Sequence, residues 1–487
     1  MEGSEGKLWI ALLLLIYTLA VSFIGYRSRQ SRSGEDYFLA SRSLPVWLLS
    51  ITFVASWWGG GSAVDLVDVA NREGLSSFCL YGIPVLISTA LMYLFAAGIR
   101  RVGTLSQPEL MERRYDSRSA LMLSLFIVVF MTIGSAVQVI VVGQFFQSFF
   151  GVSYEVGAIV GTLLVLFYSL FGGFRGVVLT DLLQFVFFLF AAIFLFVMAY
   201  QSSGGFGEMA LRGEALGREG FTSLWHNIGD NVAYILTFGT SWMVQANVWQ
   251  RISAAKEPRS AKRMMGLSFL LFIPLYLVVT LTGMLSMVSY ETPPEGGVVA
   301  AMLLSLDSPV LGGLIFVGLC SAIMSTMDSM FNTGALTLAV DIYGRHIKGG
   351  GVDSQSYVRL GRWATFVIAA ISLFIGVQIR SVLTISWIGA DFIASGAFVS
   401  LVAGFVWRRG TSIAAFVSML FGLLFSSYNL LVTLGVNLPV GWEIASTTQA
   451  IVGLCSSAVI YVVVSLLTLP DYERADRFIG DARVLNK

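Results

Sequence analysis

Thirteen apolar runs of roughly twenty residues each divide almost the whole chain, and they decide what it can fold into. A helix rises 1.5 Å per residue, so about 20 apolar residues are needed to cross the ~30 Å hydrocarbon core of a bilayer. The runs cover residues 8–26, 45–71, 75–99, 120–149, 154–173, 177–201, 231–250, 264–288, 311–341, 360–379, 382–406, 411–433 and 448–469. The sequence therefore predicts an all-α polytopic membrane protein with thirteen transmembrane helices.

The composition agrees with a membrane protein and excludes several other classes. Apolar residues make up 56% of the chain and charged residues 12%, and the net charge of +1 provides no basic surface for nucleic acid. Cys79, Cys320 and Cys455 match no metal-ligand spacing, and His226 and His346 lie far apart in loops. We therefore expect neither an enzyme nor a zinc protein nor a nucleic-acid partner.

The basic residues predict the orientation of the chain. With the N-terminus outside, 25 of the 30 Lys and Arg residues fall in inside loops, as the positive-inside rule requires. The first run continues into Arg27 without a small-residue cleavage site, so we interpret it as a retained helix rather than a signal peptide. Compact loops favour a bacterial inner membrane, with the C-terminus cytoplasmic.

Two glycine-rich interruptions suggest how the spans are grouped. Gly59–Gly61 interrupts the second run and Gly239–Ser241 the seventh, and each of these runs opens a set of five. Broken helices at corresponding positions are typical of inverted-repeat secondary transporters, although close helix packing also uses glycine. The predicted organisation is an extra helix with its inside loop (1–44), a first repeat (45–201), an outside loop (202–230), a second repeat (231–406), and two C-terminal helices with a short tail (407–487).

Five carboxylates fall within the predicted spans: Asp65, Asp68, Asp181, Asp328 and Asp391. A charge in the bilayer core costs at least ~2.5–3.5 kcal/mol, so each carboxylate needs a partner or a water-filled cavity. Because the sequence places essentially no Lys or Arg at comparable depth, the expected partner is a bound cation. For Asp68 and Asp391 the alternative is a helix end that reaches interfacial water.

Polar side chains form a stripe on the otherwise apolar ninth span. At 100° per residue, Ser325, Thr326, Asp328 and Ser329 lie on one side of the helix together with Ala322. Hard oxygen ligands without sulfur or imidazole favour an alkali or alkaline-earth cation. The alternative is that the hydroxyls bond to the preceding turn and serve helix packing.

With these residues the chain resembles the sodium/solute symporter family over residues 8–406. The segments that carry the resemblance are Asp36–Leu44, Ala55–Gly61, Gly172–Gly173, Thr180–Gln184, Gln245–Arg251, and the stretch from Ser321 to Ser329 that leads to Asp341–Tyr343. The resemblance implies a LeuT-type five-plus-five fold, with one helix before the core and two after it. It also implies sodium as the coupling ion, with one or two ions bound.

The resemblance further implies which residues hold sodium. The common site uses the carbonyls of Ala55, Trp58 and Ala322 and the hydroxyls of Ser325 and Thr326. A second sodium is implied near Asp181, with Ser325, Asp328 and Ser329. Several family members have Ser at the position of Asp328, which either strengthens this site or serves structure instead.

Family analogy places the solute between core helices, at Trp57, Ser62, Tyr81, Gln138, Trp242 and Gln245, with the negative charge of Asp65 nearby. The Trp57–Gly61 segment looks like the choline-transporter branch, whose aromatic faces suit an ammonium group. The hypothesis is a sodium-coupled symporter that imports a small cationic or zwitterionic amine. Sugar, amino-acid or monocarboxylate symport and a solute-gated cation channel are the alternatives, and the oligomeric state is open.

Overall fold

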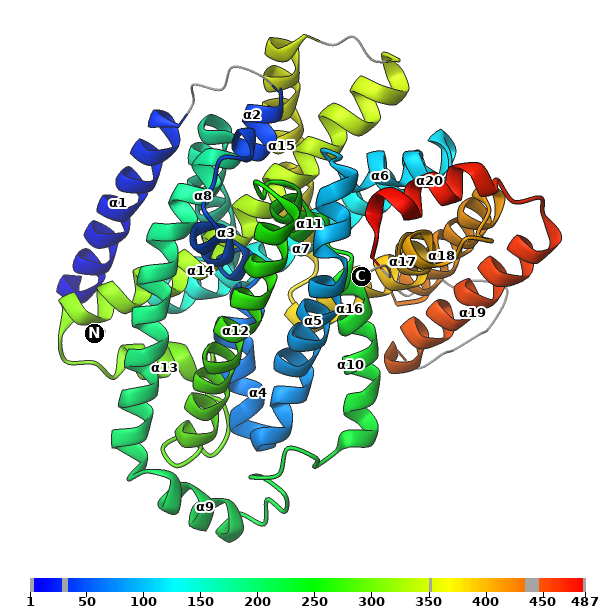
Figure 1. The fold of residues 1–487 in the computed structure, drawn as a ribbon. Coiled ribbons are helices and arrows are strands. Elements are labelled where there is room, and N and C mark those ends of the chain that lie inside the picture. Colours follow the sequence, from blue (N-terminus) through cyan, green and yellow to red (C-terminus); the bar gives the residue numbers. More distant parts are fainter. Residues whose placement is uncertain (1–3, 29–33, 350–352, 434–445, 485–487) are drawn as a thin grey trace.

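The computed structural model describes residues 4–28, 34–349, 353–433 and 446–484. Within these ranges the chain is helical throughout and forms no strand; one isolated bridge joins Leu44 to Ala255. The long helices run side by side in a bundle, with α9 at one end and α6 and α20 at the other (Figure 1). The protein is thus all-α, as the sequence predicts.

The elements of the first half carry the N-terminal helix and the first broken span. They are α1 (Ser4–Arg27), α2 (Gly34–Leu39), η1 (Ala40–Arg42), α3 (Val46–Ala55), η2 (Gly61–Asp65), α4 (Leu66–Glu73), η3 (Gly74–Ser77), α5 (Phe78–Val102), α6 (Gln107–Arg114), α7 (Ser117–Phe150), α8 (Tyr154–Ser203) and α9 (Phe206–Ala215).

The second half begins with another broken span and ends with a helix in the C-terminal tail. Its elements are α10 (Ile228–Met243), α11 (Ala246–Ser253), α12 (Pro258–Ser286), α13 (Val298–Leu304), α14 (Pro309–Leu336), η4 (Thr337–Ile347), α15 (Ser354–Gln378), α16 (Val382–Ile393), η5 (Ala394–Phe398), α17 (Val399–Val406), α18 (Ser412–Thr433), α19 (Ser446–Leu467) and α20 (Tyr472–Ala482).

Ten helices within the described ranges are long and apolar enough to cross a membrane. The other predicted spans coincide with helices that are short or broken: 45–71 with α3 and α4, 154–173 with the first part of α8, and 231–250 with α10 and α11. Breaks leave α3, α10 and α11 shorter than a full span, and the bend at Gly173 divides α8. The count of thirteen and the inverted repeat stay predictions.

Helix α8 joins two of the predicted spans in a single 50-residue element with a bend at Gly173. Gly173 has a φ of +53°, and a Cβ at this position would lie 2.7 Å from the ring of Tyr37. Glycine is required here because only it adopts this backbone while leaving room for the ring. The bend sets the direction of the second part of α8, which carries Asp181 into the centre of the bundle.

The second break does not lie where the sequence suggests. Gly239–Ser241 is continuous helix within α10, and the chain leaves the helix only at Val244 and Gln245 before α11 begins. Gly239 instead brings its carbonyl close to α5, where the Ser88 hydroxyl donates to it over 2.8 Å. The expectation of a break at Gly239 is therefore wrong, and the position does not require glycine, since a Cβ there would meet only Ile87 Cγ2 at 3.7 Å.

Candidate functional site

The first broken span lies at the centre of the candidate site. Helix α3 ends at Ala55, the chain is non-helical through Trp58 and Gly59, and η2 then continues the span. A Cβ at Gly59 would lie 2.7 Å from Gln138 Oε1 and 2.8 Å from Thr326 Oγ1, and the Gly60 amide donates to the same Gln138 oxygen over 2.9 Å. The glycines thus allow α7 and α14 to approach the non-helical backbone. The break that the sequence predicts in this segment is present.

Oxygen atoms from α14 meet this break. The Ser325 hydroxyl donates to the carbonyl of Ala55 over 2.8 Å and to that of Ala322 over 3.1 Å, and the Thr326 hydroxyl lies 3.4 Å from the Ala55 carbonyl. Ser325 and Ala322 are fully buried. The structure therefore brings together four of the five residues that the resemblance assigns to the common sodium site, and every contacting atom is an oxygen, which suits a hard monovalent cation.

Trp58, the fifth residue of that set, lies in the non-helical segment and is 1% exposed. Its ring packs on Phe188 of α8 with 4.7 Å between the ring centroids. The side chain therefore anchors the break to α8, and only the backbone of this residue remains available to an ion.

Asp181 has a basic partner, contrary to the sequence-based expectation. Arg251 Nη2 lies 3.1 Å from Asp181 Oδ2, and both side chains are at most 1% exposed. The same guanidinium donates to Ser329 Oγ over 2.8 Å, and Thr52 donates to Asp181. The prediction that no Lys or Arg lies at this depth is wrong. Arg251 directly follows the apolar run 231–250 in sequence, so the pattern assigns it to the next inside loop.

Asp328 has different neighbours from Asp181. Its Oδ1 accepts a hydrogen bond from Ser169 of α8 over 2.6 Å. The polar stripe on α14 therefore divides among three neighbours, with Ser325 and Thr326 at the first break, Ser329 at Arg251, and Asp328 at Ser169.

Short helix α11 carries further buried polar side chains after the second break. Gln250 Nε2 donates to the Phe38 carbonyl over 2.8 Å, and Asn247 Nδ2 lies 3.5 Å from the Ser56 carbonyl at the first break. With Arg251, these side chains connect the second broken span to the first and to α2, α8 and α14. From sequence, Gln245 is assigned to the solute and the segment Gln245–Arg251 to a family motif, and neither assignment predicts this role of Asn247, Gln250 and Arg251.

A central pocket of about 80 Å³ adjoins the oxygen cluster. It is lined by Trp57, Gly59, Gly61, Ser62, Tyr81, Phe130, Ile133, Gly134, Val137, Gln138, Trp242, Gln245, Thr326, Met330, Ser386 and Gly389. Six of the seven predicted solute residues are present. The exception is Asp65, which lines a separate cavity and accepts a hydrogen bond from Tyr81 over 3.1 Å. The lining of the central pocket carries no charged side chain.

Aromatic rings form one wall of this pocket. Trp242 packs edge-on against Trp57 at 6.0 Å and stacks on Tyr81 at 6.1 Å between ring centroids. Trp57 Nε1 and Gln245 Oε1 are buried without a hydrogen-bond partner. A buried polar atom without a partner costs about 1–3 kcal/mol, so this pocket favours a solute that supplies both an acceptor and a donor.

The two ends of the bundle differ in access to the pocket. At the end where α13 lies, a separate cavity has a volume of about 730 Å³, and Asp65, Asp68 and Glu295 are among its lining residues. At the end where α6 lies, the cavity has only about 10 Å³. By cavity volume, the α13 end is the more open end of the bundle and the α6 end is the closed end.

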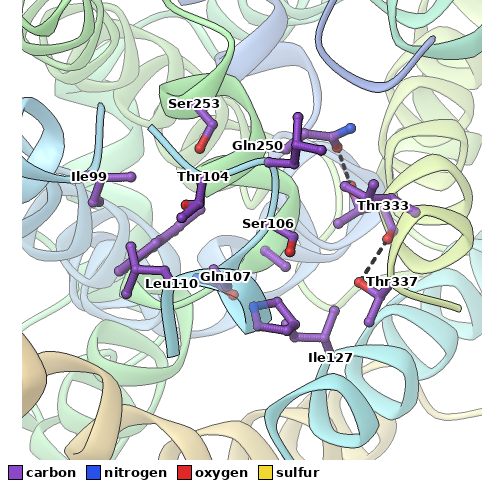
Figure 2. A pocket seen from close by; sticks show the side chains of 15 residues that line it. Ile99, Thr104, Ser106, Gln107, Leu110, Ile127, Gln250, Ser253, Thr333 and Thr337 are labelled. Carbon is purple, nitrogen blue, oxygen red and sulfur yellow. Dashed lines mark hydrogen bonds between the residues drawn. The ribbon is translucent and has the colours of Figure 1, made fainter. Parts of the chain in front are cut away.

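The closed end is sealed by polar side chains that bond to one another. Thr333 donates to Gln250 Oε1 over 2.8 Å and its carbonyl accepts from Thr337 over 3.2 Å, as Figure 2 shows. Gln107 of α6 donates to the Val244 carbonyl at the second break over 3.0 Å. Opening this end requires these bonds to exchange for water.

Comparison with known proteins decides the family. A model of the sodium:solute symporter family matches residues 37–422. This chain belongs to that family. The osmoregulated proline transporter of Bacillus subtilis (strain 168) is 23% identical over 492 residues, covering 97% of both chains. A sodium/proline symporter of Staphylococcus aureus is 24% identical over 479 residues, covering 94% of this chain and 92% of that one.

Solved structures of sodium-coupled symporters share the fold. A Na⁺-coupled sialic acid symporter superposes with a TM-score of 0.79 at 18% identity, covering 95% of this chain and 98% of that one. A nucleobase-cation-symport-1 transporter gives 0.60 at 12% identity over 93% and 99% of the two chains. The symporter is thus a multi-pass membrane transporter of LeuT type, not an enzyme, and sodium is its coupling ion. The relatives named here are proline transporters, so the similarity to the choline branch finds no support.

Proposed function

We propose that this symporter imports a small zwitterionic amino acid of the proline class together with one sodium ion. The observation that carries the proposal is the position of Thr326, which lines the central pocket and also lies 3.4 Å from the Ala55 carbonyl in the oxygen cluster. Solute and ion therefore share one wall. An ion that orders this wall also orders the pocket, which links the two binding events.

Sodium binds in this proposal at the carbonyls of Ala55, Trp58 and Ala322 and the hydroxyls of Ser325 and Thr326. The donor set supports this, because hydroxyl and carbonyl oxygens are hard ligands and Ser325 already lies within 3.1 Å of two of the carbonyls. In the absence of an ion the hydroxyls donate to these carbonyls. On binding, the same oxygens turn their lone pairs to the cation.

The solute assignment rests on the charge and size of the pocket. Among the described residues, neither a carboxylate nor a basic side chain lines it, so a zwitterion fits better than a net cation. Asp65 lines the other cavity, so its negative charge does not favour a cationic solute in this pocket. The unpaired Trp57 Nε1 donates to a carboxylate, and the unpaired Gln245 Oε1 accepts from an ammonium group. A volume of about 80 Å³ favours a solute of proline's size over a sugar acid.

A single sodium follows from the position of Arg251. Its guanidinium bonds to both Asp181 and Ser329, so a second ion at Asp181, Asp328 and Ser329 requires Arg251 to move away. We place the larger cavity on the outside, in agreement with the predicted N-out orientation, so this structure corresponds to the state that receives sodium and solute.

The test is uptake into proteoliposomes with an imposed sodium gradient, comparing radiolabelled proline, sialic acid and choline. We expect saturable, sodium-dependent uptake of proline alone, and Ser325→Ala to raise the sodium concentration for half-maximal uptake about tenfold, since one hydroxyl ligand is lost. Ser124→Ala, whose buried hydroxyl donates to the Ala120 carbonyl of its own helix α7 and which lines neither the central pocket nor the closed-end cavity, is the matched control. Sodium-coupled choline uptake without proline uptake overturns the solute assignment, and non-saturable flux favours a channel.

A further inference from the structure

Asp391 is a buried carboxylate that neither the sodium cluster nor the central pocket uses. It lies within α16, which continues directly into η5 and α17, and it is 3% exposed. Its Oδ1 accepts a hydrogen bond from Ser395 over 3.0 Å, and no Lys or Arg of the described residues forms an ion pair with it. The alternative that this carboxylate reaches interfacial water at a helix end is therefore wrong.

The carboxylate lines a second cavity of about 300 Å³ between α10, α16, α18 and α19. The lining residues are Tyr234, Leu383, Thr384, Trp387, Ile388, Asp391, Ser426, Asn429, Leu430 and Gln449, and none of them lines the central pocket. Helix α16 separates the two spaces. Ser386 and Gly389 border the central pocket, whereas Thr384, Trp387 and Asp391 border the second cavity.

The chemistry of the lining selects a class of ligand. Tyr234 and Trp387 meet edge-to-face with 5.0 Å between ring centroids, which presents aromatic surface beside the carboxylate. Aromatic faces and a carboxylate that forms no ion pair with a described Lys or Arg attract an organic ammonium group, and burial strengthens that attraction. The volume matches about ten water molecules at roughly 30 Å³ each, far more than a bare alkali ion needs.

We propose that this second cavity binds a small organic ammonium cation with an apolar body, and that the bound cation slows transport by holding α16. The mechanical link is a chain of rings. Trp387 contacts Phe238 at 5.6 Å, and Phe238 stacks on Trp242 of the central pocket at 4.8 Å. An occupant behind α16 therefore opposes any movement of α16 and α10 that closes the central pocket over its solute.

The binding test needs no transported solute, so its failure is separate from failure of the proposed function. We would measure thermal unfolding of the purified full chain in detergent with 2-phenylethylamine, and with neutral 2-phenylethanol as the control. We expect the amine alone to raise the melting temperature in proportion to the logarithm of its concentration above its Kd. Absence of a shift, or an equal shift with the alcohol, overturns the proposal.

Variants on opposite faces of the α16 wall locate the binding. Asp391→Asn should abolish the shift caused by the amine, and Ser426→Leu should abolish it by filling the second cavity while keeping the carboxylate. Ser386→Leu intrudes on the central pocket from the same helix and should leave the shift intact. If Asp391→Asn does not fold, Ser426→Leu decides. A shift that survives Ser426→Leu, or that is lost in Ser386→Leu, places the amine elsewhere and overturns the proposal.

Transport gives an independent readout of the effect on α16. In proteoliposomes, 2-phenylethylamine should lower the maximal rate of proline uptake at least threefold and leave the KM for proline unchanged, and Ser426→Leu should remove this inhibition. Competitive inhibition, with a raised KM and an unchanged maximal rate, overturns the proposed site because it places the amine in the solute pocket.

Discussion

The ion pair between Arg251 and Asp181 is the most consequential electrostatic contact in the structure. Both side chains are at most 1% exposed, so removal of one partner leaves the other charged and buried. For buried pairs this costs about 3–5 kcal/mol, whereas replacement of both partners by apolar groups is often neutral. We therefore expect Arg251→Met to lower the free energy of unfolding by about 4 kcal/mol, and the double variant Asp181→Leu with Arg251→Met to recover most of that loss.

Sodium gives this prediction a second readout. In Arg251→Met the carboxylate of Asp181 retains the Thr52 hydroxyl and lacks its cation, and Ser329 loses the same guanidinium. A sodium ion can then take the place of the guanidinium, and at one hundred times its Kd it restores about 2.7 kcal/mol. The stability of Arg251→Met should therefore rise with sodium far more steeply than that of the wild type, and binding of radioactive sodium should increase by one site.

The assay is equilibrium unfolding by a denaturing detergent at several sodium concentrations, with potassium keeping the ionic strength constant. Arg408→Met is the matched control, because its pair with Asp476 is 60% and 50% exposed and such pairs contribute at most about 1 kcal/mol. The reasoning is refuted if Arg251→Met is within 1 kcal/mol of the wild type, or if the double variant is no more stable than Arg251→Met alone.

Three further predictions concern the central pocket. Gly60→Ala should abolish uptake, because the new Cβ would lie 2.7 Å from Val141, whereas Gly229→Ala, with nothing within 4 Å of its Cβ, should transport normally. Gln245→Leu should raise the KM for proline about tenfold, because it removes a buried acceptor worth roughly 1–3 kcal/mol; an unchanged KM would contradict the proposed pose. Asp65→Asn should leave the Kd for proline within threefold, as isothermal calorimetry of proline binding can check, since this residue lies outside the pocket lining.

The sequence predicts those features that depend on residues close together in the chain. Twenty-residue apolar runs identify membrane helices because the bilayer fixes their length, and three consecutive glycines at Gly59–Gly61 mark a break because they weaken the helix so strongly. The single Gly239 was a weaker signal, and the actual break at Val244 and Gln245 carries no glycine at all. There the chain leaves the helix because of its tertiary surroundings.

The features that sequence analysis missed depend on how distant segments meet. Arg251 adjoins a loop in sequence and lies in the centre of the protein in space, 70 residues along the chain from its partner Asp181. Its burial follows from the second break, which turns α11 inward. For Asp391 a helix end that reaches interfacial water is one alternative from sequence, because sequence alone does not reveal the cavity between α16 and the two C-terminal helices.

Three of the buried polar residues of α11 should constrain which substitutions the protein tolerates during evolution. Asn247, Gln250 and Arg251 each reach a different segment, and each partner is itself buried. A substitution at one of these positions leaves an unmatched polar group on another helix, which selection removes unless a second change compensates. Among relatives as distant as 23% identity, Arg251 with Asp181 and Gln250 with Thr333, which meet through their side chains, should therefore be exchanged together, whereas Asn247, whose partner is the backbone carbonyl of Ser56, should vary without a matching change.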